Sequence, residues 1–120
     1  MPTPSELLHA NLHEIFGERN HDRRRAAIEK YYTEDITFSD PEGAHTGWDA
    51  VDNAAEALLT GAPAEFSFED AGPQYLGGET AALAWTFGPP GSPVARGIDI
   101  LTIRDGQVAR IQTILAGPTG

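Results

Sequence analysis

The sequence predicts an α+β domain in which three helices precede an antiparallel β-meander. Apolar residues recur every three or four positions up to about residue 60, and at every second position from residue 65 onward. Between the last two alternating runs lies Asp105-Gly106, a strong signal for a two-residue hairpin turn. Because there is no internal repeat and no linker, we expect one domain over residues 1–120, with its folded core at about residues 5–115.

The first helix is predicted from a capping box and an apolar stripe. Thr3 and Glu6 have the capping-box spacing, and Pro4 suits the first helical position. We expect about twelve helical residues, ending near Gly17. The apolar stripe consists of Leu8, Leu12, Ile15 and Phe16.

The second helix is expected to begin after Asp22, a residue type that commonly caps helices. The arginines at positions 23–25 then point toward solvent, opposite the apolar stripe. That stripe consists of Ala27, Ile28, Tyr31 and Tyr32.

A third helix is predicted from Trp48 to about residue 60. Its apolar residues are separated by three, four and three positions, and Gly61 and Pro63 end it. The stripe consists of Trp48, Val51, Ala55 and Leu58.

The extended segments are predicted from alternation. A short strand around Ile36 and Phe38 leads into a turn-rich segment at residues 40–47. Further strands are expected at residues 66–76, 81–87, 94–104 and 108–115.

Charge and composition exclude several classes of function. Eight Lys and Arg against 18 Asp and Glu give a net charge of −10, and residues 31–95 contain no Lys or Arg, which argues against a nucleic-acid partner. The absence of cysteine excludes disulfides and thiolate zinc sites. No segment resembles a secretory signal or approaches the ~20 apolar residues of a membrane helix, so we expect a cytoplasmic protein with no membrane partner.

Asp99 is the first candidate for chemistry. In the strand at residues 94–104, arginines at both ends of one face mark it as the outer face, so Asp99 is the only charge on the face toward the helices. Burial among apolar neighbours would raise its pKa. Gly97, two residues earlier, is a residue type that often marks a bend or bulge. The alternative is a half-exposed side chain at a twisted edge of the sheet.

Asp40 is the second candidate. It ends the strand around Phe38 and precedes Pro41, which favours an extended backbone. Asp also forms turns by accepting hydrogen bonds from amides two residues on, and the pattern alone favours this interpretation. The separation between Asp40 and Asp99 in the sequence gives no distance between them.

Other chemistry-bearing residues are less specific. His9 and His13 are four apart on a helix, but no third ligand is evident and no metal site is predicted. His45 follows Asp40 and could contact a ligand or lie exposed in a loop. Trp48 and Trp85 suit a pocket wall as well as a core.

Residues 37–43 are Thr-Phe-Ser-Asp-Pro-Glu-Gly, a helix led by Gly47 follows, and the meander ends at residues 105–111. In this order, the elements resemble the NTF2-like superfamily, and within it the SnoaL-like group of polyketide cyclases and ketosteroid isomerase relatives. The resemblance covers about residues 5–115. It implies a cystatin-like cone, in which a curved antiparallel sheet wraps N-terminal helices around an internal pocket.

The resemblance also implies roles for the two carboxylates. In ketosteroid isomerase, an Asp-Pro pair supplies the base and an Ile-Asp pair supplies a protonated acid of the oxyanion hole; Asp40-Pro41 and Ile98-Asp99 match these pairs. The oxyanion tyrosine of the first helix has no counterpart in this chain.

Two classes of function follow from the resemblance. One is a cofactor-free isomerase or cyclase acting beside a carbonyl of a small apolar organic ligand; the other is a non-catalytic binding or dimerisation module. A homodimer through the outer sheet face is expected, at Ile98, Ile100 and Ile114. The expected pocket residues are Phe16, Tyr32, Phe38, His45, Trp48, Trp85, Leu101 and Leu115.

Overall fold

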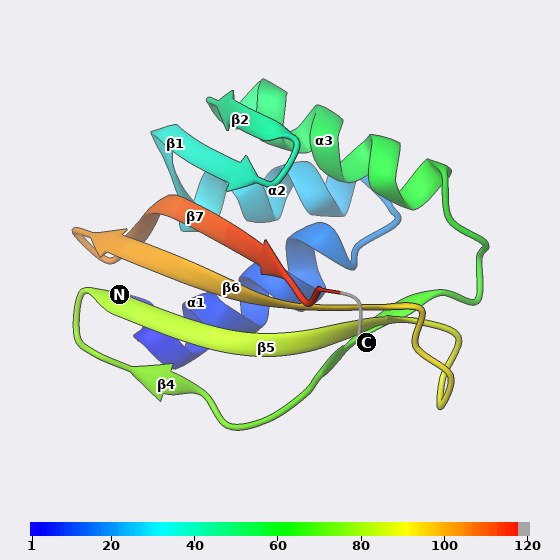
Figure 1. Cartoon of the computed structure of the whole chain (residues 1–120). Coiled ribbons are helices and arrows are strands. Elements are labelled where there is room, and N and C mark those ends of the chain that lie inside the picture. The colour runs from blue at the N-terminus through cyan, green and yellow to red at the C-terminus, as the bar shows by residue number, and fades with distance from the viewer. Residues whose placement is uncertain (118–120) are drawn as a thin grey trace.

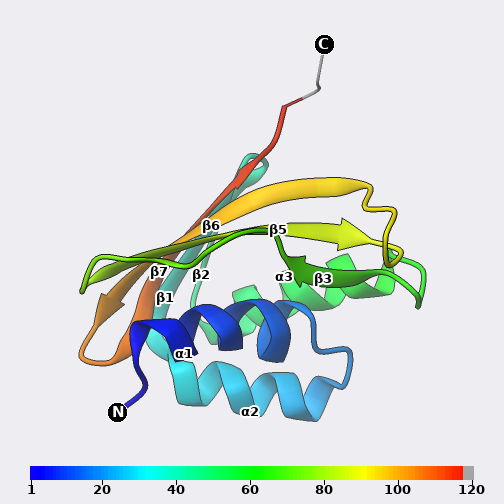
Figure 2. The ribbon, with the colours of Figure 1, turned by 90° about the horizontal axis from the view of Figure 1, so that it is seen from below.

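A curved sheet with helices against one side forms the framework of the protein (Figures 1 and 2). This computed structural model describes residues 1–117. The helical segments are α1 (Pro4–His9), the π-helical η1 (Ala10–Phe16), α2 (His21–Tyr31) and α3 (Trp48–Thr60). The strands are β1 (Tyr32–Asp40), β2 (Gly43–Thr46), β3 (Ser67–Asp70), β4 (Tyr75–Leu76), β5 (Thr80–Gly88), β6 (Ala95–Arg104) and β7 (Gln107–Leu115).

All seven strands belong to one sheet, with the order β2-β1-β7-β6-β5-β3 and with β4 also paired to β5. The α+β cone expected from the sequence is therefore confirmed. One pair departs from the expected antiparallel arrangement, because β1 runs parallel to β7. These strands are joined through α3 and the rest of the meander, and such a long connection places no hairpin constraint on their direction.

The N-terminal capping box is confirmed. Thr3 Oγ1 accepts a hydrogen bond from the Glu6 amide at 3.1 Å, and Glu6 Oε1 accepts one from the Thr3 amide at 3.2 Å. The predicted cap of the second helix is wrong. Asn20, not Asp22, accepts from the Arg23 amide at 2.9 Å, so α2 begins at His21.

The expectation that all three arginines of α2 face solvent is also wrong. Arg24 is fully buried between α2 and α3. Its Nε donates to Asp52 Oδ1 at 2.8 Å, and its Nη2 donates to Glu56. Burial lowers the pKa of Arg24, but the hydrogen bonds to Asp52 and Glu56 outweigh it and raise the pKa above its ordinary value.

Three strand boundaries differ from the prediction. Tyr32 begins β1 instead of ending the preceding helix, and the turn-rich segment at residues 40–47 contains β2, which forms a hairpin with β1. The single strand predicted at residues 66–76 is two strands, β3 and β4, which pair with different parts of β5. The intervening residues 71–74 include Gly72 and Pro73, which interrupt the ladder.

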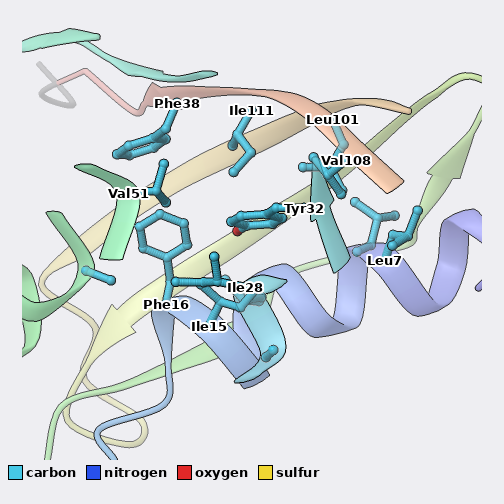
Figure 3. Close-up of a cluster of buried hydrophobic side chains, with 14 of the residues drawn as sticks. Leu7, Ile15, Phe16, Ile28, Tyr32, Phe38, Val51, Leu101, Val108 and Ile111 are labelled. Atoms are coloured by element: carbon cyan, nitrogen blue, oxygen red, sulfur yellow. The ribbon is translucent and has the colours of Figure 1, made fainter. Parts of the chain in front are cut away.

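The core lies between the sheet and the helices (Figure 3). The predicted alternation holds, because Ala81, Leu83, Trp85 and Phe87 of β5 are all buried on one face. Figure 3 shows Tyr32 in the middle of the cluster, with Phe16 and Phe38 together at one end of it. Within residues 1–117, no helix is long and apolar enough to cross a membrane.

Candidate active site

A cavity of about 240 Å³ opens between the sheet and the helical layer. Its walls are mostly aromatic and aliphatic, and they carry three carboxylates and one hydroxyl. The lining residues are Phe16, Phe38, Asp40, Glu42, Leu58, Phe68, Trp85, Asp99, Thr113 and Leu115.

The alternation of β6 turns Asp99 inward. Arg96 and Ile98 on either side of the buried Gly97 are exposed, whereas Asp99 is only 6% exposed and Leu101 is fully buried. The inward direction predicted for Asp99 is therefore observed.

Three uncharged side chains donate hydrogen bonds to the Asp99 carboxylate. Trp85 Nε1 and Thr113 Oγ1 donate to Oδ1 at 2.9 and 2.8 Å, and Asn11 Nδ2 donates to Oδ2 at 2.9 Å. Each carboxylate oxygen can accept about two hydrogen bonds, so Oδ1 is satisfied and Oδ2 has capacity for one more. That remaining position can accept a hydrogen bond from a ligand or carry an exchangeable proton.

Asn11 links Asp99 to a buried tyrosine. The Tyr32 hydroxyl donates to Asn11 Oδ1, and Asn11 and Tyr32 are 1% and 0% exposed. Asn11 belongs to η1, and π-helical segments occur often at functional sites. The sequence analysis missed this residue, although a polar side chain beside Leu12 on the apolar stripe of the first helix is a signal that could have revealed it.

Burial dominates the electrostatics of this network. Burial raises the pKa of Asp99, and the hydrogen bonds from Thr113, Trp85 and Asn11 only partly oppose this effect. Burial, together with the charge of Asp99, raises the pKa of Tyr32 well above its ordinary value. The Tyr32 hydroxyl therefore remains a donor over the physiological pH range.

Gly97 gives Trp85 its position. The two residues are paired across β5 and β6, and a Cβ at position 97 would lie 2.5 Å from Cζ2 of the Trp85 indole. Only glycine leaves room for the indole to lie across β6. The indole N–H can then reach Asp99, two residues along the strand.

Asp40 both caps a turn and lines the cavity. Its Oδ1 accepts hydrogen bonds from the amides of Glu42 and Gly43 at 2.9 and 3.0 Å, as the turn interpretation predicts. In the part of the chain that the structure describes, Oδ2 has no hydrogen-bond partner. The cavity thus brings Asp40 and Asp99 to the same space, which the sequence alone did not establish.

Four of the eight expected pocket residues line the cavity: Phe16, Phe38, Trp85 and Leu115. Phe16 and Phe38 contact each other with ring centroids 5.0 Å apart. Both belong to the lining of the cavity, and Figure 3 shows them together at one end of the buried cluster.

The structure places the other four elsewhere. Tyr32 and Leu101 lie in the core, fully buried (Figure 3). His45 stacks behind Phe38, with centroids 5.7 Å apart. Trp48 donates to the Tyr32 carbonyl at 3.1 Å and lies beside Arg25, at the interface of α2 and α3.

Four lining residues were not expected: Glu42, Leu58, Phe68 and Thr113. Phe68 was recognised only as part of an alternating strand, although its ring packs edge-on against Trp85 at 5.3 Å. Thr113 lies directly opposite Asp99 in the β6–β7 ladder. Among residues 1–117, no group of three or more His, Asp or Glu side chains is arranged to hold a metal ion.

Comparison with known proteins places this architecture in a family. The model of the SnoaL-like domain matches residues 12–111, which is most of the chain. The chain belongs to the SnoaL-like family. No curated protein matches it.

Solved structures agree with the SnoaL-like fold. A protein designated an isomerase of the SnoaL-like family, from Agrobacterium tumefaciens strain C58, is 23% identical with a TM-score of 0.84, covering 92% of this chain and 95% of that one. A protein designated a polyketide cyclase, from Sinorhizobium meliloti, is 20% identical with a TM-score of 0.69, covering 94% of each chain. A de novo designed protein with a curved β-sheet is 13% identical with a TM-score of 0.73, covering 94% of this chain and 84% of the design. Since a designed protein shares the fold, the fold alone does not assign a reaction.

Proposed function

We propose that this SnoaL-like protein binds a small organic carbonyl compound in the cavity and catalyses an isomerisation or ring closure without a cofactor. The observation that carries this proposal is the pair of carboxylates, Asp40 and Asp99, in different environments on the wall of one apolar cavity. Two titratable groups whose surroundings differ can act as base and acid in one reaction. The isomerase and polyketide cyclase designations of proteins with the same fold support this choice.

In the proposed reaction, Asp40 is the general base. Its Oδ2 removes a proton from a carbon beside the substrate carbonyl, and the electron pair of that C–H bond moves to form an enolate. Asp99, protonated on Oδ2, donates a hydrogen bond to the enolate oxygen. The proton then returns from Asp40 to a different carbon in an isomerisation; in a cyclisation, the enolate carbon attacks a second carbonyl and the resulting alkoxide is protonated.

The surroundings of Asp99 support its role as the acid. Its raised pKa favours the protonated form, and Oδ2 has capacity for one further hydrogen bond. Trp85 and Thr113 fix Oδ1, so the carboxyl group cannot rotate without losing both bonds. A donor held in this way needs little rearrangement when charge develops on the substrate oxygen.

An exchange experiment tests this proposal without knowledge of the natural substrate. Small cyclic ketones are incubated with the protein in D₂O, and the loss of protons beside the carbonyl is followed by NMR. We expect acceleration by the wild-type protein and a loss of about 10²- to 10⁴-fold in Asp40→Asn, which retains the Oδ1 acceptor of the turn. Asp99→Asn should also lose activity, and Asp105→Asn, which removes a carboxylate in the distant β6–β7 turn, is the control. Equal exchange rates in the wild type, Asp40→Asn and Asp99→Asn would refute the proposed roles.

A non-catalytic binding module of the same fold is the second candidate. The observation that favours it is Asn11, which stands where the first helix approaches Asp99 and supplies an amide rather than a tyrosine hydroxyl. Ketones that bind in the cavity but show no accelerated exchange would establish this alternative.

We further propose a homodimer through the outer sheet face. Ile98 and Ile114 are cross-strand partners on β6 and β7 and are 43% and 47% exposed. They border a groove of about 340 Å³, which also includes Ala84 and Leu115. Apolar side chains gathered on one face of a sheet favour a covering partner. Sedimentation should show a dimer for the wild type and a monomer for Ile98→Glu; a monomeric wild type at high concentration would contradict the proposal.

A further inference from the structure

The charges around the cavity all have the same sign. Asp40, Glu42 and Asp99 line it, and no Lys, Arg or His is among its lining residues. The sequence explains the imbalance, because residues 31–95 include most of the wall and contain no Lys or Arg.

Asp99 has no cationic partner within the described residues. Its three hydrogen-bond donors, Asn11, Trp85 and Thr113, are all neutral. A buried carboxylate is ordinarily paired with a cation, because the charge is costly to remove from water. An anionic ligand group in this cavity would likewise find no cation to pair with, and the carboxylates of Asp40 and Glu42 would repel it.

The remaining wall suits a flat ring. Phe16, Phe38, Phe68 and Trp85 contribute aromatic rings, whose faces attract cations and stack on other rings. A cavity of roughly 150 Å³ in another protein holds benzene, so the 240 Å³ here has room for one ring with a short substituent.

We propose that the cavity selects its ligand by charge, accepting a ring-sized compound that is neutral or cationic and excluding one that carries a carboxylate. The inference rests on the proposed function in taking this cavity as the ligand site. It restricts the substrate to a ketone, lactone, ester or amide without a free acid group, because the cavity wall offers three carboxyl groups and no basic side chain.

Three compounds of nearly equal shape test the proposal: benzamide, benzamidinium and benzoate, which are neutral, cationic and anionic. Each is titrated into the full chain at pH 7.5 and constant ionic strength. The Trp85 indole N–H resonance reports binding, because this group donates directly to Asp99. The Trp48 indole N–H, which donates to the Tyr32 carbonyl away from the cavity, is the internal control.

We expect benzamide and benzamidinium to shift the Trp85 resonance to saturation. Benzoate should bind at least about tenfold more weakly than benzamide, since like charges a few ångströms apart repel far more strongly in protein than in water. Benzoate binding within twofold of benzamide would overturn the proposal. No shift of Trp85 with any of the three at millimolar concentration would overturn it as well.

Variants test which residues cause the selection against an anionic ligand. Asp40→Asn, and separately Glu42→Gln, should narrow the difference in affinity between benzoate and benzamide, because each removes one carboxylate from the cavity wall. Asp105→Asn removes the same formal charge in the distant β6–β7 turn, where Asp105 has a positive φ that Asn tolerates, and should leave this difference unchanged. An equal effect of all three variants would assign the selection to net charge and refute a local filter. Because binding is measured without turnover, the failure of the proposed reaction leaves this test intact.

Discussion

Asp52 and Asp99 are both buried carboxylates, but they are held in opposite ways. Asp52 lies between α2 and α3 and accepts a hydrogen bond from the buried guanidinium of Arg24 at 2.8 Å, with His21 Nε2 3.3 Å from its other oxygen. Asp99 lines a cavity, and within residues 1–117 it accepts hydrogen bonds from neutral groups only. The first arrangement joins two helices and pairs the carboxylate with cationic side chains. The second leaves an acceptor position on a carboxyl group that has no cationic partner among residues 1–117.

The difference separates a structural carboxylate from a candidate functional one. In a buried ion pair, each charge is neutralised by its partner. Removing one partner leaves the other charge buried and unpaired, which lowers the free energy of unfolding. A buried carboxylate without a cation costs stability in the resting protein, and such a cost is typical of sites whose charge serves a ligand or a reaction. Variants at each region test this contrast.

The largest effect is expected at the ion pair. Arg24→Leu removes the buried cation that pairs with Asp52 and Glu56, although Arg25 Nη1 still lies 3.6 Å from Asp52 Oδ2. It should lower the free energy of unfolding by about 3–5 kcal/mol, as measured by urea denaturation. Arg24→Lys, which keeps the positive charge, should lower the free energy of unfolding by a smaller amount. The exposed neighbour provides the matched control, because Arg23→Leu should change stability by at most about 1 kcal/mol. Equal losses in Arg24→Leu and Arg23→Leu would remove the distinction between the two regions.

A smaller loss is expected at the neutral network. Asn11→Leu removes a donor from Asp99 and the acceptor of the Tyr32 hydroxyl, and each unsatisfied buried group costs about 1–3 kcal/mol. The pKa of Asp99, followed by carboxyl ¹³C NMR, should rise further, because the lost donor favours the charged form.

Tyr32→Phe is the graded comparison for that variant. This substitution removes only the hydrogen bond from the Tyr32 hydroxyl to Asn11. It should lower the free energy of unfolding by about 0.5–1.5 kcal/mol and change the pKa of Asp99 less than Asn11→Leu does. A larger change in the pKa of Asp99 in Tyr32→Phe than in Asn11→Leu would contradict the arrangement in which Asn11 contacts Asp99 directly and Tyr32 contacts it only through Asn11.

Gly97→Ala tests how the cavity wall is built. The new methyl group would lie 2.5 Å from the Trp85 ring and 2.7 Å from the Ile114 carbonyl oxygen, so both the indole and the β7 backbone must shift, at a cost of about 1–3 kcal/mol. The Trp85 indole N–H resonance should shift, because its bond to Asp99 is weakened. Gly117→Ala, where nothing lies within 4 Å, serves as the control and should be close to neutral. An unchanged Trp85 resonance in Gly97→Ala would contradict this account of the wall.

The smallest effect is a dependence of stability on pH. Burial raises the pKa of Asp99 in the folded protein above its value in the unfolded chain. Between these two values the folded state binds the proton and the unfolded state does not, so stability falls as pH rises through this window. Relative to Asp99→Asn, the wild type should therefore lose stability on going from pH 4 to pH 8 in urea titrations. A constant difference between the two proteins would contradict the raised pKa.

Local rules predicted much of the fold and half of the site. The capping box at Thr3, the hairpin turn at Asp105-Gly106 and the inward direction of Asp99 follow from period and turn chemistry, which depend on neighbouring residues only. The exposure of Arg24 was mispredicted because a helical period does not reveal that a second helix covers the polar side.

The register of the pairing between β6 and β7 could not be predicted from these local rules. If β6 and β7 paired without interruption from the two-residue turn onward, Gln112 would lie opposite Asp99. The structure instead has an irregularity between Thr102 and Ile103 that shifts the pairing by one residue. As a result, Thr113 lies opposite Asp99. Thr113 then donates to Asp99, and Gln112 faces away from the cavity wall.

The sequence by itself determined the α+β architecture, the direction of Asp99 and the one-sided charge of residues 31–95, because each depends on residue type and short spacing. Only the tertiary structure decided that Asp40 and Asp99 share a cavity, that Asn11 and Tyr32 support Asp99 from within, and that Arg24 is buried. These features depend on contacts between residues far apart in the chain. Such contacts are set by how the helices pack against the curved sheet.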